Sequence, residues 1–293
     1  MKAFSNFHPL VLFFYFISVL LLTMFTLHPV LLFFSLLGAV LFASMLETPR
    51  AVLVSLGFYV PMFLLIAVTN PLFSHNGVTP LFFMNDNPVT LEAILYGAAA
   101  AGMVISVMYW CRCYNTVVTS DKFLYLFGKL IPKLSLILSM ALRFVPLFTA
   151  QVKKISRIQK TMGLYSSESK VDRLRGGFRV FSAIVTWSLE NAVDTAASMR
   201  ARGYGLPGRS NYSIYRFTPR DGAALGILAV LLGGSLWGMK TKVLEFSYYP
   251  RVAALSLTPV VLAGYAVVSA LMFLPFLIEV KENLVWNYFR SKI

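Results

Sequence analysis

Six long apolar runs dominate this chain, and each has about the length of a helix that crosses a membrane. A helix needs roughly 20 predominantly apolar residues to cross about 30 Å of hydrocarbon. Because 58% of the residues are hydrophobic and only 13% are charged, one soluble core could not hide the apolar surface. We therefore predict an all-α, polytopic integral membrane protein with about six spanning helices. The runs lie at residues 9–25, 29–46, 51–69, 89–110, 222–239 and 252–278.

Basic residues are concentrated in the middle of the chain. Of the 26 Lys and Arg residues, 13 lie between residues 153 and 220. Lys and Arg accumulate in the cytoplasmic connections of membrane proteins, so we place this segment in the cytoplasm. The connections 26–29 and 70–88 carry no Lys or Arg and are placed outside, which puts both termini in the cytoplasm. The net charge of +14 then reflects a membrane face, and we expect no nucleic-acid partner.

A further apolar stretch, at residues 134–150, resembles a span, but its flanks argue against a crossing. Lys133 precedes it, and Lys153 and Lys154 follow it, so both of its ends belong on the same side. The stretch 180–189 has basic flanks of the same kind. We expect both stretches to be helices at the cytoplasmic surface, with apolar faces in the membrane or against partner helices.

Glycine stop signals mark the ends of two long central helices. The first helix continues past Pro146 as an amphipathic stripe and ends at Gly163. The second runs from about Asp172 to Arg202 and ends at Gly203, since glycine just beyond a helical pattern is a common C-cap. The chain is thus expected to have three parts, at residues 1–120, 121–218 and 219–293.

Local signals after the third run predict a turn and then a capped helix. The Asn70-Pro71 pair indicates a chain reversal rather than a helix. Thr90 is placed to cap the next helix, with Glu92 in its first turn, where a carboxylate is favourable. We therefore expect a structural role for Glu92 rather than ion binding. No metal site is expected, because the cysteines and histidines lack ligand spacing: Cys111, Cys113, His8, His28 and His75.

An ordered set of motifs resembles the transmembrane T component of energy-coupling factor transporters. The segment Met199-Arg200-Ala201-Arg202-Gly203-Tyr204-Gly205 is similar to the second Ala-Arg-Gly coupling motif of that family. Residues 70–77 and 90–97 are similar to its outer loop and following helix, and residues 141–146 resemble the start of its first long coupling helix. The motifs cover most of residues 70–220 and keep the order of the family.

The resemblance implies a non-catalytic subunit of an importer in the cell membrane of a prokaryote, with two or three long cytoplasmic coupling helices. Its expected partners are two ABC-type ATPases and a small membrane protein, the S component, which captures a vitamin or other micronutrient. ATP and Mg would be bound by the ATPases, and this chain would bind no cofactor itself. Its contact with an ATPase is expected at Arg200, Ala201, Arg202 and Gly203.

The first coupling motif departs from the pattern of the family. Where a first Ala-Arg-Gly is expected, this chain has Thr161-Met162-Gly163, which keeps the glycine but not the arginine. Arg157 or Lys160, one turn or less earlier, could supply the charge, and Met162 could insert as a flexible apolar side chain.

The competing hypothesis is a membrane-embedded enzyme that acts on an anionic lipid or a phosphate substrate held by the basic segment. Such an enzyme needs a nucleophile or an acid–base set facing that segment. No histidine occurs beyond His75, and no paired acidic motif with metal spacing is present, so this hypothesis ranks second. Its candidate residues are Glu168, Asp172, Glu190, Asp194, Ser166, Ser167 and Ser169.

Overall fold

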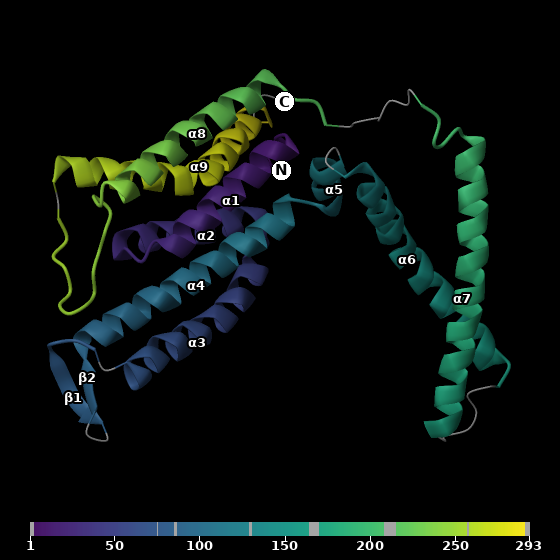
Figure 1. Ribbon diagram of the computed structural model, residues 1–293, viewed down its shortest axis with the longest axis horizontal. Coiled ribbons are helices and arrows are strands. Elements are labelled where there is room, and N and C mark those ends of the chain that lie inside the picture. The colour runs from purple at the N-terminus through teal and green to yellow at the C-terminus, as the bar shows by residue number, and fades with distance from the viewer. Residues whose placement is uncertain are drawn as a thin grey trace. The chain divides into compact units, whose positions relative to one another are not determined.

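The computed structural model describes residues 3–74, 76–84, 87–128, 131–163, 170–207, 215–256 and 258–290, and its elements are almost all helical. Helices and strands follow one another as η1 (Phe4–Asn6), α1 (Pro9–Phe25), α2 (Pro29–Leu46), α3 (Pro49–Phe73), β1 (Pro80–Met84), β2 (Asn87–Thr90), α4 (Leu91–Val117), α5 (Ser120–Gly128), α6 (Pro132–Thr161), α7 (Lys170–Ala201), α8 (Pro219–Lys240) and α9 (Pro259–Arg290). The predicted all-α fold class is confirmed (Figure 1).

The chain folds into two compact units. The bundle unit comprises Met1–Phe123 and Tyr215–Ile293, and the central unit comprises Leu124–Ile214. The chain therefore leaves the bundle unit within α5 and returns to it just before α8. Each unit is described by itself below.

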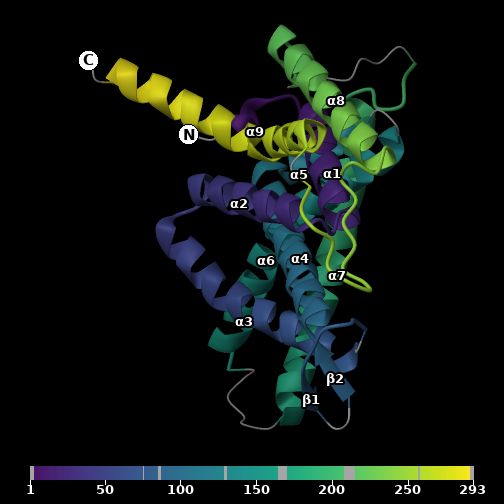
Figure 2. The same ribbon diagram turned by 90° about the vertical axis from the view of Figure 1, so that its left-hand side faces the viewer.

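The bundle unit packs its helices around an aromatic core. Helix α4 lies against α1, α2 and α3, while α9 packs on α2 and α8 (Figures 1 and 2). Trp110 on α4 is fully buried, and its ring meets those of Tyr15 and Phe16 on α1. Its indole N–H donates to the Ser35 hydroxyl at 3.1 Å, so the one polar atom of this large side chain has a partner.

Two features at the end of α3 differ from the sequence prediction. The predicted reversal at Asn70-Pro71 is wrong, because α3 continues through both residues to Phe73. The Asn70 amide donates to the backbone oxygen of Ala93 at 3.1 Å, and Pro71 is buried, so tertiary contacts hold the last turn in helical form. Proline removes only one backbone donor there, close to the end of the helix. A short antiparallel hairpin, β1–β2, follows and was not predicted.

The predicted cap at the start of α4 is confirmed. The Thr90 hydroxyl accepts a hydrogen bond from the Ala93 N–H at 3.3 Å. Glu92 is 2% exposed and accepts from the Thr79 hydroxyl at 2.7 Å. The N–H groups of Val78 and Thr79 also point to its carboxylate, at 3.4 Å each. Glu92 therefore fastens the loop before β1 to the start of α4, which is a structural role.

Among the described residues, six helices are long and apolar enough to cross a membrane: α2, α3, α4, α6, α8 and α9. This set includes α6, which basic flanks predict to stay on one side, and omits α1, which is apolar but has 17 residues. The last apolar run also differs from its predicted bounds. Residues 252–256 and 258 are not helical, and α9 begins at Pro259, a residue preorganised for the first turn, before it continues to Arg290.

The central unit is built on the pair α6 and α7. The Phe148 ring on α6 meets Trp187 on α7 edge to face, with ring centroids 5.8 Å apart, and stacks on Phe144 at 5.6 Å. Among the described residues of α6, none is buried. Large apolar side chains on both helices, such as Ile137 and Phe181, are more than 60% exposed. The two helices thus share a narrow contact and leave most of their apolar surface uncovered.

Candidate functional site

The end of α7 is closed by a paired hydrogen-bond cap. The Gly203 N–H donates to the Arg200 carbonyl at 2.9 Å, and the Tyr204 N–H donates to the Met199 carbonyl at 3.0 Å. This pair of bonds is the Schellman motif, which requires a left-handed residue just beyond the helix. Gly203 has φ +77°, a value that glycine adopts without strain. The glycine of the predicted motif therefore fixes where α7 stops.

The arginines of this tip are exposed to solvent. Arg200 lies in the last turn of α7 and Arg202 directly follows the helix, where the negative end of the helix dipole favours a cation. Within the described ranges, neither guanidinium has an acidic side chain within ion-pair distance. A guanidinium is suited to bidentate contacts with carboxylates and to backbone carbonyls. The tip is therefore able to accept a protein partner.

The end of α6 has the same glycine stop with different side chains. The Gly163 N–H donates to the Lys160 carbonyl at 3.1 Å, and Gly163 has φ +73°. Met162 is 72% exposed, and the Thr161 hydroxyl donates to the Ile158 carbonyl at 2.8 Å. A shallow hollow of about 490 Å³ lies five to nine residues before Met162, and its exposed basic residues are Lys153, Lys154 and Arg157.

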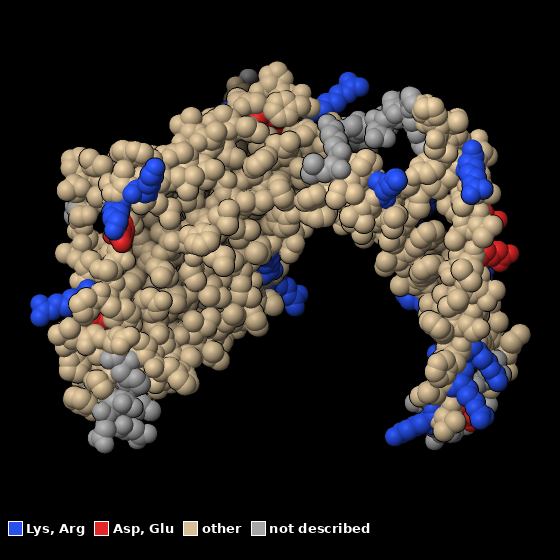
Figure 3. All heavy atoms as spheres, in the orientation of Figure 1, with Lys and Arg blue, Asp and Glu red and all other residues tan. Residues whose placement is uncertain are grey.

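The two tips lie at opposite ends of the central unit. In Figure 1, α6 ends close to the side where α7 begins, and α7 ends at the other side. Helix α7 has 32 residues and is therefore about 48 Å long. Basic side chains gather at the end of the unit where α6 finishes (Figure 3). Since the tips are this far apart, they are suited to two separate contacts rather than one.

The residues that an enzyme would need are not brought together. Asp172 and Glu190 lie at positions 18 residues apart on α7, about 27 Å along the helix axis. Asp194 is one turn beyond Glu190 on the same face. The other candidates, Ser166, Ser167, Glu168 and Ser169, lie outside the described residues, as does His75. Within the described ranges, no group of three His, Cys, Asp or Glu side chains could hold a metal ion.

The comparison with known proteins identifies the family. Residues 8–213 match the family described as CbiQ, cobalt transport protein. The chain belongs to the CbiQ family. The predicted relationship to the T component of energy-coupling factor transporters is confirmed, because the curated relatives carry that name. A multi-pass membrane subunit of a transporter follows from this membership and from the apolar helices.

Three relatives of this CbiQ-family chain are each called energy-coupling factor transporter transmembrane protein EcfT. The one from Listeria innocua is 28% identical over 198 residues, which cover 60% of this chain and 72% of the relative. The one from Lacticaseibacillus paracasei is 33% identical and that from Lactobacillus helveticus 29%, over 35% of this chain in each case. The matches span 40% and 38% of these two relatives, so less than half of their length.

Sequence reasoning missed three buried charges in the bundle unit. Lys122, Asp221 and Glu279 are 6%, 3% and 1% exposed, and all three bind the N-terminal segment of the chain. Asp221 had a local signal, because it stands at the third position of a capping box that begins at Thr218. Glu279 follows directly on an apolar run, and Lys122 lies in a short helix, so neither pattern revealed a partner.

Proposed function

We propose that this chain couples two cytoplasmic ABC-type ATPases to a substrate-capturing S component in the cell membrane of a prokaryote. The ATPases bind and hydrolyse ATP with Mg, and this chain transmits their motion without catalysis of its own. The S component binds the cargo, a vitamin or other micronutrient, so specificity resides in that partner. Both termini and the two helix tips are on the cytoplasmic side, as the distribution of basic residues favours.

One observation carries this proposal: two helix ends with the same glycine stop lie at opposite ends of one unit (Figure 1). A pair of separated ends fits a pair of ATPases. The tip of α7 presents Arg200 and Arg202 as exposed cations, while the tip of α6 presents Met162 as an exposed apolar side chain. We therefore assign the main electrostatic contact to Arg202 and a mainly apolar contact to Met162.

The test is charge reversal at the α7 tip. Arg202→Glu removes the donor fork and places a negative charge at the negative end of the helix, so the ATPases should no longer co-purify with the chain from membranes. Arg179→Glu is the matched control, since Arg179 is an exposed arginine of α7 far from the tip. Membrane levels of both variants are measured alongside. Undiminished co-purification of the ATPases with Arg202→Glu would show that Arg202 does not make the main electrostatic contact.

The α6 tip has its own test. Met162→Asp should weaken the second contact, because an exposed apolar anchor is replaced by a charged group. We expect complexes that retain fewer ATPase subunits, as measured by the subunit ratio on native mass spectrometry. Unchanged stoichiometry and stability of the complex would contradict a role for this tip.

A further inference from the structure

Residues Ala3–His8, here called the N-terminal clasp, are held by side chains from three different elements of the bundle unit. These side chains are the buried charges Lys122 of α5, Asp221 of α8 and Glu279 of α9. Lys122 lies one residue before the chain leaves the bundle unit, and Asp221 lies six residues after the chain returns to it at Tyr215. The clasp therefore connects both ends of the central segment to the bundle.

The outgoing connection is fastened by Lys122. Its ammonium donates to the Ser5 carbonyl at 2.6 Å, the Ser5 hydroxyl at 2.8 Å and the Val117 carbonyl at 2.9 Å. All three ammonium donors thus have acceptors, two of them on the clasp and one at the end of α4. Burial lowers the pKa of Lys122 below its ordinary value. A buried amine with these acceptors fixes the start of α5 to the clasp.

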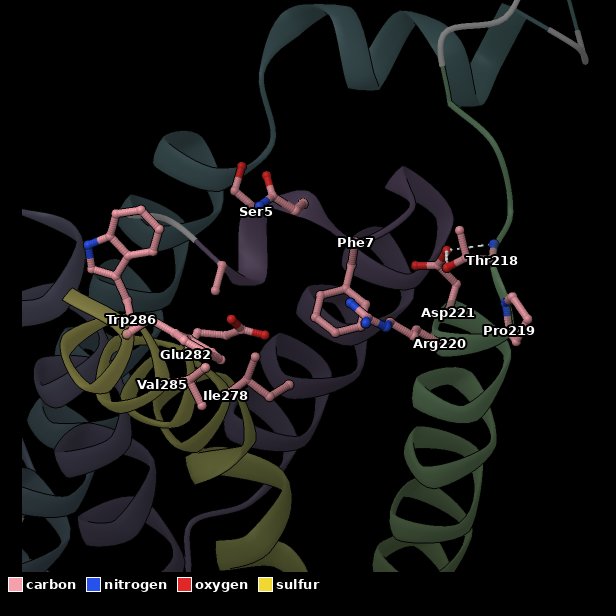
Figure 4. A pocket seen from close by; sticks show the side chains of 13 residues that line it. Ser5, Phe7, Thr218, Pro219, Arg220, Asp221, Ile278, Glu282, Val285 and Trp286 are labelled. Carbon is pink, nitrogen blue, oxygen red and sulfur yellow. Dashed lines mark hydrogen bonds between the residues drawn. The ribbon is translucent and has the colours of Figure 1, made fainter. Parts of the chain in front are cut away.

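The returning connection is fastened by Asp221. One carboxylate oxygen accepts from the His8 N–H at 2.8 Å, and the other accepts from the Thr218 N–H at 2.9 Å and the Thr218 hydroxyl at 2.6 Å. Figure 4 shows Thr218 and Asp221 facing each other at the start of α8. The Phe217 ring also meets the His8 ring edge to face, with centroids 5.4 Å apart. One carboxylate therefore joins the clasp to the re-entry segment.

The clasp itself is anchored to the bundle. Glu279 of α9 accepts from the N–H groups of Ala3 at 3.1 Å and Phe4 at 3.0 Å. The Phe4 side chain is 1% exposed and packs edge to face on Tyr15 and Phe42. A movement of the clasp would thus displace its contacts with both α9 and the aromatic core.

Packing alone does not hold the clasp in place. On one side it borders an open cavity of about 940 Å³, whose walls include Ser5, Phe7 and Trp286 (Figure 4). Burying a charge is unfavourable unless hydrogen bonds compensate for the lost water. Here the clasp supplies both hydrogen bonds to Glu279, two of the three to Lys122 and one of the three to Asp221.

We propose that the N-terminal clasp is a positioning link that ties the two connections of the central unit to α9, so that ATP-driven movement reaches the bundle. Lys122, Asp221 and Glu279 are its positioning residues. This link rests on the proposed coupling function. Without it, displacement of the central unit would be absorbed where the chain leaves and re-enters the bundle unit.

The test measures amide hydrogen exchange in the complete transporter, purified with its partner subunits in lipid nanodiscs. Exchange in residues 3–12 and 215–225 is compared between the nucleotide-free complex and the complex trapped with MgATP and vanadate. In the natural protein, we expect nucleotide to change exchange in both segments. A purely structural clasp would exchange slowly but would not respond to nucleotide.

Two variants sever the link, and each has a matched control. Lys122→Met and Glu279→Gln should raise basal exchange of residues 3–12 by about tenfold or more, since each loses at least one charge-assisted hydrogen bond to the clasp. They should also abolish the nucleotide response while ATP hydrolysis continues. Lys281→Met and Glu245→Gln change exposed residues of the bundle unit in the same way and should leave both readouts unchanged.

The outcomes separate this inference from the proposed function. If the ATPases co-purify but nucleotide leaves residues 3–12 of the natural protein unaffected, the link is wrong and the coupling function stands. A nucleotide response that survives in Lys122→Met and Glu279→Gln also overturns the link. If no ATPase co-purifies with the natural protein, the proposed function fails. The nucleotide response of residues 3–12 in the natural protein tests the link even if a variant does not assemble.

Discussion

The two units of this protein differ in how many of their large apolar side chains are buried. In the bundle unit, large side chains such as Phe42 and Trp110 are fully buried against one another. In the central unit, comparable side chains such as Phe181 are 65% exposed, and the described residues of α6 include none that is buried. Exposed apolar surface of this extent marks a site of interaction with a membrane or a protein. The bundle unit thus has a buried core beneath an apolar surface that is also exposed, as at Phe58 and Phe73, whereas the described part of the central unit has almost no buried side chain.

Replacing one phenylalanine by alanine in each unit tests this difference most directly and should have the largest effect. Phe42→Ala leaves a cavity among Phe4 and Trp110 and should lower the free energy of unfolding by about 3 kcal/mol. Phe181→Ala removes an exposed ring and should change it by less than about 0.5 kcal/mol. Denaturant unfolding of the isolated chain in detergent measures both.

The assembled complex should reverse this order. If partners or lipid cover α7, Phe181→Ala should reduce recovery of the complex from membranes, although the isolated chain is as stable as before. Phe178→Ala, at another exposed ring of α7, extends the test. A loss of stability in the isolated chain as large as that of Phe42→Ala would show that the central unit has a core of its own.

The glycine stops allow a second comparison, between the two tips. Gly203→Ala forces a side chain into the left-handed region and should destabilise the end of α7 by about 1 kcal/mol. Its Cβ would also come within 3.1 Å of Leu206, whereas a Cβ at Gly163 meets none of the described residues within 4 Å. Gly203→Ala should therefore have a somewhat larger effect than Gly163→Ala. Local amide exchange measures the fraying.

Asparagine is the control for this pair, because it tolerates the left-handed conformation better than alanine. Gly203→Asn should retain most of the cap. Equal fraying with alanine and asparagine would mean that φ is not the constraint at this tip.

The smallest expected effect is a pH dependence confined to the bundle unit. His28 is 4% exposed, its Nε2 lies 2.9 Å from the Tyr265 hydroxyl, and burial lowers its pKa below the ordinary 6.5. The unfolded chain therefore binds a proton at a higher pH than the folded chain. Stability contributed by neutral His28 is present above pH 6.5 and is lost as the pH falls through the lowered pKa.

Thermal unfolding in detergent measures this dependence. Between about pH 7.5 and about pH 5.5, the natural protein should lose more thermal stability than His28→Gln, which cannot take up the proton. Fraying at the α7 tip should be unaffected over the same range. An identical pH dependence in the two proteins would show that His28 does not contribute.

Much of the fold follows from patterns within single segments. The apolar run at residues 29–46 locates α2, and the glycine stops at Gly163 and Gly203 locate the ends of α6 and α7, because each signal acts within one helix. The continuation of α3 through Pro71 could not be predicted, since it depends on the contact of Asn70 with Ala93 of another helix. The sequence predicts a span at α1 and none at α6, whereas the helices long and apolar enough to span include α6 and not α1. This difference reflects helix length and composition alone.

In the candidate site and the clasp, too, local contacts could be predicted from the sequence and long-range contacts could not. The cap around Gly203 could be predicted from the order of residues, because its hydrogen bonds join neighbours in the chain. The bonds from Glu279 to Ala3 and Phe4 cross 276 and 275 positions, and no local pattern carries them. Contacts of such long range become visible only when the bundle is assembled.

The crossing of α6 and α7 sets the mechanics of the central unit. Phe148 and Trp187, where the helices meet, lie 13 and 14 residues before the ends of their helices at Thr161 and Ala201. The two arms from the crossing to the tips are thus about 20 Å and about 21 Å long. Levers of nearly equal length turn equal displacements at the two tips into nearly equal rotations about this contact.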